Sequence, residues 1–232
     1  MYPRFCCCNV QSAVHGIRQE VGDWTLTRVS RKGYIFLHKW EQDLNISFTE
    51  AQKTKILSLA HTSSISSRIA EVNYKVLTRW HLTPAALHGI FPQTSPLCWR
   101  GCGNRATHAH LWWYCPNIRP YWVSVLNCMK EIQGFETPND PGVVLLHCTD
   151  RPVGPYKKSL TPHFLNAAKS LIPRYWKSNI IPTLRQWLEE VDHTYHMEDL
   201  TLSNRNKSDL ATKIWADWFA FKFTTRYASI VS

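Results

Sequence analysis

One short block of cysteines and a histidine constrains this chain of 232 residues more than any other feature of it. Cys98, Cys102, His110 and Cys115 follow the pattern C-x3-C-x7-H-x4-C. Thiolate and imidazole groups are the ligands of structural zinc, which takes four of them in a tetrahedron. A glycine stands on each side of Cys102, where the backbone must turn back so that both thiolates face one ion. The block therefore predicts a zinc site, and its H-x4-C half is typical of a zinc knuckle.

Two alternatives stay open for this block. His108 is a rival ligand to His110, although His110 has the knuckle spacing to Cys115. The cysteines could also be unrelated free thiols, which a reducing compartment keeps in that state.

The zinc ion is expected to be structural. A catalytic zinc keeps an open position for water and works beside a general acid or base. Here four protein ligands fill the shell, and no acidic residue occurs between Glu71 and Glu131. The H-x-E pattern of zinc deaminases does not occur in the block either. We therefore predict no catalytic residue and no enzymatic activity from this chain alone.

Apolar spacing predicts a mainly α-helical fold, with the small Cys3His module embedded among helices and few or no short strands. Apolar residues recur with helical spacing from Ile65 to Trp80. Gly134 and Pro173 are typical of helix ends. The two strand candidates are the short runs 34–37 and 143–146. Helix starts are expected at these residues: Thr49, Ser64 or Ser66, Thr83, Asn117, Thr161, Pro182 and, for the last helix, Ser208.

The composition divides the chain into four parts. Residues 1–33 are an unrelated leader, with disorder as an open alternative. Residues 34–136 form a helical region that contains the zinc module at 98–115. Prolines and turn residues make 137–156 a linker, and residues 157–232 form a C-terminal helical region.

The charge pattern favours a polyanionic partner. The chain has 27 Lys and Arg against 17 Asp and Glu, a formal net charge of +10. Two long stretches contain no acid, the first from Glu71 to Glu131 and the second from Arg151 to Leu188. Such stretches are typical of a groove that binds nucleic acid, and the alternative is an ordinary solvated surface.

Aromatic residues crowd the first of these stretches. Rings among Lys and Arg suit single-stranded nucleic acid, because bases stack on the rings and cations contact phosphates. Core packing is the preferred interpretation for Trp122 and Trp80, and one of Trp112 and Trp113 is expected to lie nearer the surface. The candidate nucleic-acid contacts are Lys75, Arg79, Trp99, Arg100, Arg105, Trp113 and Arg119.

No apolar run approaches the roughly 20 residues of a membrane span, and the N-terminus lacks the apolar core of a signal peptide. We therefore expect an intracellular protein, cytoplasmic or nuclear, without a membrane partner. Its eight cysteines should then be thiols or metal ligands.

Three runs of sequence resemble the C-terminal region of LINE-type, non-LTR retrotransposon reverse transcriptases, especially those of vertebrate elements. They are NYKVLTRWHLTP (73–84), FPQTSPLCWRGCG (91–103) and HLWWYCP (110–116). The resemblance extends from about Lys39 to Glu198, and the four zinc ligands match the family's one for one. It implies a region that follows the polymerase domain and helps to hold template RNA.

The family's catalytic motifs are missing from this chain. The polymerase turn Tyr-x-Asp-Asp is absent, and no Asp-Asp pair occurs anywhere. The endonuclease constellation has no counterpart either. The resemblance therefore implies a detached, non-catalytic piece of a transposon reading frame.

Three functions remain open from the sequence. The first is a zinc-stabilised module that binds RNA or single-stranded DNA. The second is a helical protein-interaction domain, with other retrotransposon proteins as candidate partners. The third is a relic reading frame without function.

Overall fold

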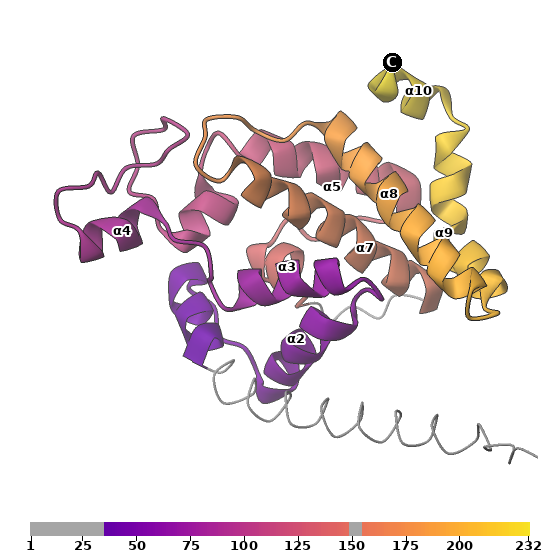
Figure 1. Ribbon diagram of the computed structural model, residues 1–232, viewed down its shortest axis with the longest axis horizontal. Helices are drawn as coiled ribbons and strands as arrows, with labels where there is room; N and C mark the ends of the chain where they lie inside the picture. The colour runs from indigo at the N-terminus through magenta and orange to yellow at the C-terminus, as the bar shows by residue number, and fades with distance from the viewer. Residues whose placement is uncertain (1–34, 149–154) are drawn as a thin grey trace, which may run out of the picture.

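Helices make up nearly all the regular structure of the computed structural model, which describes residues 35–148 and 155–232 (Figure 1). The predicted mainly α fold is confirmed, whereas the leader at 1–33 lies outside the described residues. A helix over 35–44 comes first. It is followed by α2 (Glu50–Thr62), α3 (Ser67–Leu77), α4 (Pro84–Ile90), η1 (His110–Tyr114), α5 (Arg119–Gln133), α6 (Pro141–Leu146), α7 (Pro155–Leu171), η2 (Ile172–Tyr175), α8 (Leu184–Ser203), α9 (Ser208–Lys222) and α10 (Thr225–Val231).

Helix starts follow local capping chemistry. Thr49 and Thr183 each form a capping box, in which the threonine hydroxyl accepts the backbone N–H of a glutamine three residues on and that glutamine's side chain accepts the threonine N–H. Thr83 caps α4 before its proline. Gly134 ends α5 with φ 69°, a left-handed conformation that favours glycine. These signals are short-range, which is why the sequence alone predicts them.

Some predicted helix starts are displaced by one residue or incomplete. The cap positions of α5 and α9 are Ile118 and Lys207, one residue away from the predicted Asn117 and one before the predicted Ser208. The helix that begins at Ser208 is not the last, because Thr224 caps the further helix α10.

Both strand predictions are wrong. The described part of the first, residues 35–37, lies in a helix, where Leu37 and Trp40 are buried one turn apart. The second, 143–146, lies in α6, whose N-terminus is capped by Asp140 ahead of Pro141. A short apolar run suits a buried helix as well as a strand, so periodicity could not distinguish them.

The predicted helix start at Thr161 is also wrong, because α7 runs from Pro155 through Pro162 to Leu171. The Thr161 hydroxyl donates to the side chain of Gln133 on α5 and does not cap a new helix. A proline inside a helix removes one backbone hydrogen bond, and here packing against neighbouring helices outweighs that cost. As predicted, α7 ends just before Pro173.

The segment predicted as a linker is structured where it is described. It contains α6, and Val144, Leu145 and Leu146 are buried there. One hydrophobic cluster includes residues from both sides of it, from Trp40 to Phe221. Residues 34–136 and 157–232 therefore share a core.

Tryptophan builds that core. Four indole N–H groups donate to backbone carbonyls of other segments, for example Trp40 to Leu77 at 3.1 Å and Trp187 to Phe164 at 3.0 Å. An indole ring fills a large volume of the core, and its N–H group can hydrogen-bond to another segment and so fix how the two segments align. In Figure 1, α7 crosses the middle of the molecule, and it packs against α3, α5, α8 and α9. The buried tryptophans are Trp40, Trp112, Trp113, Trp122, Trp176, Trp187, Trp215 and Trp218.

A cluster of buried polar side chains connects α7 with the C-terminal end of α6. Lys169 on α7 is fully buried, and its Nζ donates to the carbonyl of Leu145 at 3.2 Å and lies 2.8 Å from His147 Nε2. Asn166 Oδ1 is 2.9 Å from the same nitrogen. Burial lowers the pKa of Lys169 well below its usual value, and no carboxylate forms an ion pair with it within the described residues. Burial thus disfavours the charged form of the amine.

We predict that Lys169 makes folding stability rise with pH. Between the lowered pKa of folded Lys169 and the usual value of 10.5, the unfolded chain binds a proton that the folded chain does not, so stability falls as pH decreases through this range. The slope from this group is at most about 1.4 kcal/mol per pH unit. Urea unfolding between pH 8.5 and 10 should therefore give a smaller slope for Lys169→Met than for the unchanged protein. Lys213→Met, at an exposed position of α9, is the control, and equal slopes in all three proteins would contradict the prediction.

Candidate metal centre

The first two predicted ligands lie on a tight hairpin. Leu97 and Arg105 form an antiparallel bridge, and the N–H of Cys98 donates to the carbonyl of Asn104 at 2.9 Å. Gly101 and Gly103 have φ of 74° and 77°. A side chain would find space at both positions, so it is the left-handed backbone that favours glycine here. The hairpin thus turns Cys98 and Cys102 towards one point.

The other two ligands lie at the ends of one π-helical turn, η1. The N–H of Cys115 donates to the carbonyl of His110 at 2.8 Å, a bond between residues five apart. An α-helix pairs residues four apart, whereas a π-turn brings residues five apart onto the same turn. This geometry explains the H-x4-C spacing, which the sequence shows without its cause.

The four ligand atoms converge as zinc requires. They lie within 4.8 Å of one another. The Sγ atoms of Cys98 and Cys115 are 3.8 Å apart, and Cys102 Sγ is 3.3 Å from His110 Nε2. Zinc–sulfur bonds of about 2.3 Å in a tetrahedron place two sulfurs about 3.8 Å apart. The donor set therefore fits a zinc ion, and the cluster does not include His108.

Burial and hydrogen bonds give the thiols different acidities. Burial, with a smaller contribution from Cys115, raises the pKa of Cys98 to about 12. Burial also acts to raise the pKa of Cys102, but hydrogen bonds from the Asn104 backbone and neighbouring groups lower it overall. The pKa of His110 is lowered by burial and by nearby Arg100, so its neutral ring is available as a ligand. Metal binding must then displace protons from the thiols, Cys98 above all.

Cationic side chains brace the module from inside. Arg100 is buried and donates to the carbonyl of Leu111 at 2.7 Å, while Asn117 donates to the carbonyl of Arg100 at 2.6 Å. Arg119 lies over the ring of Trp113, with 4.3 Å to the ring centroid. These contacts connect the hairpin, the π-turn and the start of α5.

The structure does not leave most of the candidate nucleic-acid residues free for contact. Arg100 and Trp113 are buried, which contradicts their predicted roles in phosphate contact and base stacking. Arg79 pairs with Asp43 at 2.6 Å, and Lys75 pairs with Glu71 at 2.7 Å. The rest are Trp99, which is half-buried against the core, Arg119, which is partly buried on Trp113, and Arg105, which is exposed.

Two further residues correct the aromatic predictions. Trp80, predicted as core, is 65% exposed, because the chain turns out of α3 at Arg79. Trp112 and Trp113, of which one was expected near the surface, are both buried. Trp122 is fully buried, as predicted. Trp80 is exposed because α3 ends at Leu77. The helical spacing of apolar residues continues to Trp80, so the sequence did not show that the helix ends before it.

The search of protein-family models finds none that matches this chain. Within residues 35–148 and 155–232, the helices lack the combination of length and apolar composition needed to cross a bilayer.

We predict one zinc ion per chain. Cys115→Ser should abolish it, because three ligands leave a closed site open to water. Cys128→Ser is the matched control, since Cys128 is equally buried but lies outside the cluster. Elemental analysis of the purified proteins measures the stoichiometry. A zinc-free native protein, or full zinc content in Cys115→Ser, would contradict the assignment.

The same site should bind zinc more weakly as pH falls, because protons compete for the thiolates. Each thiol that ionises on binding should weaken the affinity about tenfold for every unit of pH decrease. Competition with a chromophoric chelator at pH 6.5 and 7.5 measures this change.

Proposed function

We propose that this chain is a zinc-stabilised module that binds single-stranded nucleic acid, with RNA as the first candidate and single-stranded DNA as the second. The observation that carries the proposal is the exposed ring of Trp80, whose chain neighbours Arg79 and His81 line one pocket together with Lys39 and Arg105. Trp80 follows Arg79, whose guanidinium donates to the carbonyl of Lys39 at 3.0 Å. Lys39 and Arg105 are exposed, and neither forms an ion pair with a carboxylate within the described residues.

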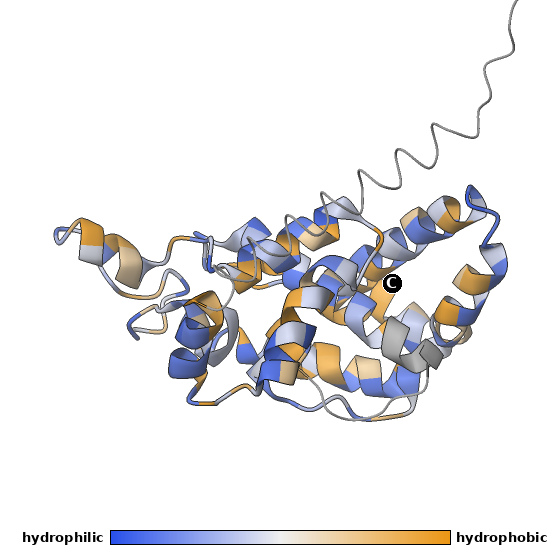
Figure 2. Cartoon of the chain, turned by 90° about the horizontal axis from the view of Figure 1, so that it is seen from below, coloured by the Kyte–Doolittle hydropathy of each residue, from blue (hydrophilic) through white to orange (hydrophobic). Residues whose placement is uncertain are grey.

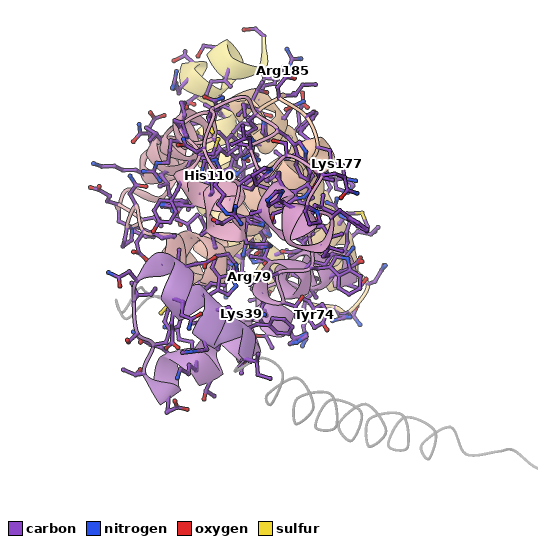
Figure 3. The ribbon with its side chains drawn as sticks, turned by 90° about the vertical axis from the view of Figure 1, so that its left-hand side faces the viewer. Lys39, Tyr74, Arg79, His110, Lys177 and Arg185 are labelled. Carbon is purple, nitrogen blue, oxygen red and sulfur yellow. The ribbon has the colours of Figure 1, made fainter. Side chains whose placement is uncertain are left out.

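These groups have the chemistry that a single strand needs. An exposed indole offers a face on which any base can stack, and stacking needs no base sequence. Cations next to it contact phosphates and release counterions. Tyr74 in α3, which precedes Trp80 in the sequence, is also exposed, at 37%. Figure 3 labels Lys39, Tyr74 and Arg79, which lie near one another in that view.

Zinc would hold the hairpin that carries Arg105. Without the ion, only thiol hydrogen bonds, Cys98 to Cys115 and Cys102 to His110, would join the four ligand groups. The hairpin would then depend on these, on its backbone hydrogen bonds and on the Arg100 brace. The proposed role of the metal is therefore structural, and the proposed module has no catalytic activity of its own. The resemblance to retrotransposon reverse transcriptases supports this role and an intracellular location.

A second candidate function is protein interaction, which the end of the molecule at α4 favours. Ile90 is 60% exposed, Phe91 48% and Leu97 49%. Figure 2 shows apolar residues on this projecting helix. Exposed apolar patches are typical of protein interfaces.

We predict salt-dependent binding to a single-stranded oligonucleotide. If about two or three cations contact phosphate, a plot of log affinity against log salt should have a slope of about −1.4 to −2, from roughly 0.7 per contact. Trp80→Ala should cost ~1–3 kcal/mol of binding free energy without changing the slope, while Arg105→Gln should reduce the slope by about 0.7. Fluorescence anisotropy at several salt concentrations measures both effects.

Trp113→Ala serves as the contrast, because Trp113 is buried. It should lower the melting temperature, whereas Trp80→Ala should leave it nearly unchanged. Affinity that ignores salt, or no binding at low salt, would reject the nucleic-acid proposal in favour of protein interaction.

A further inference from the structure

A pocket of about 420 Å³ lies beside the zinc module. Its walls come from the helix over 35–44, the turn after α3, the start of α4 and residues 105–108. We name it the His108 pocket. Its polar and charged lining includes Lys39, Arg79, His81, Arg105, Thr107 and His108.

His108 is the feature that needs an explanation. It is 4% exposed, and neither of its ring nitrogens has a hydrogen-bond partner within the described residues. Its ring packs edge-on against Trp40, with centroids 5.3 Å apart. Buried polar groups are nearly always hydrogen-bonded, and an orphaned one calls for a missing partner. The ring lines the pocket, but its nitrogens are covered in the free protein. A ligand there would provide that partner by turning the ring between its indole neighbours Trp40, Trp112 and Trp176.

The charge of the lining indicates the kind of ligand. Asp43 also lines the pocket, but Arg79 neutralises it at 2.6 Å. Arg79 is fixed further by its backbone, which has φ 57° in the turn that closes α3, and by its position over the Trp40 ring, 5.5 Å from the centroid. Lys39 and Arg105 remain as positive charges without an acidic partner among the described residues. The pocket therefore suits an anion.

Two hydroxyls add neutral donors. Thr83 accepts the N–H of Ala86 at 3.1 Å, and Thr107 accepts the N–H of His110 at 3.2 Å. Each hydroxyl keeps its own proton, which it donates to no acceptor within the described residues. Hydroxyls and guanidinium groups are the donors that phosphate oxygens take.

The pocket is larger than a phosphate needs. Apolar atoms of Phe36, Leu82 and Ala85 share the lining with the ring of His81. Pockets of 300–1,000 Å³ hold small organic ligands, and a planar base can lie against an apolar or aromatic wall.

We infer that the His108 pocket binds one nucleotide unit, with its phosphate between Lys39, Arg105 and the His108 ring and its base on the apolar wall. This inference rests on the proposed function, because a single strand crossing the surface at Trp80 would place a nucleotide here. Thr107 links the pocket to the zinc module, since it holds the N–H of the ligand His110.

Adenosine 5′-monophosphate is the probe, with adenosine and inorganic phosphate for comparison. Saturation-transfer NMR on the full chain with zinc should detect the nucleotide. Phosphate should displace it, and adenosine should bind at least tenfold more weakly. The double variant Lys39→Gln/Arg105→Gln should lose at least tenfold in affinity. The control Arg205→Gln/Lys213→Gln removes the same charges at the α8–α9 turn and on α9, at the opposite end from α4 (Figure 1), and should bind normally.

His108→Phe provides a second, sharper variant. It keeps a ring against Trp40 and removes the orphaned nitrogens, so it should lose nucleotide binding while its thermal stability and zinc content stay at least as high. A lower melting temperature together with normal nucleotide binding would show that His108 is structural and would overturn the inference.

The outcomes separate the inference from the proposed function. Binding of an oligonucleotide without binding of the mononucleotide, and with no difference between the two double variants, would reject the pocket and leave the function standing. Binding of the mononucleotide alone would support the pocket and reject the function. Binding of neither would reject both.

Discussion

Four ligand atoms that must reach one point dominate the zinc-module end of this molecule. The hairpin and the π-turn are both shaped by that requirement, one through left-handed glycines and the other through a bond between residues five apart. Three of the four residues between the two π-turn ligands face the core, whereas Tyr114 is exposed. Leu111, Trp112 and Trp113 are buried in the helical core. One turn of chain thus joins the metal to the core, and loss of the ion should loosen both.

Several lysine and arginine side chains make internal contacts. Positive charge is therefore scarcer on the surface than the composition suggests. Arg100 and Arg119 brace the module, Arg79 holds the turn after α3, and Lys169 is buried among the helices. The cations left over near the zinc module are few and lie close to the exposed indole of Trp80. The proposed nucleic-acid contacts are therefore confined to that edge.

Much of the local structure could be predicted from the sequence. Capping threonines, the left-handed Gly134 and the ligand set act over a few residues, and each has a distinctive pattern. The failures depend on distant contacts. Nothing local shows that Arg100 turns inward to a carbonyl eleven residues away, or that Thr161 bonds to Gln133. Short apolar runs such as 143–146 were predicted as strands although they form a helix, because a buried helix needs no polar face and so shows no helical spacing of apolar residues.

Candidate contacts were harder to predict than ligands for a related reason. A ligand is defined by spacing and chemistry, whereas a contact residue must also be exposed, which only the packed chain decides. Trp80 and Trp113 exchange their expected environments, because the first is exposed and the second is buried.

The π-turn also sets a rule for insertions and deletions. A π-turn is an α-turn with one residue more. Removal of any one of residues 111–114 would restore the ordinary helical bond, but it would swing Cys115 and the start of α5 by about 100° around the helix axis. The side chains of this segment can vary within the limits of packing. Its length cannot vary, because the same turn must direct His110 and Cys115 towards the ion and the tryptophans into the core.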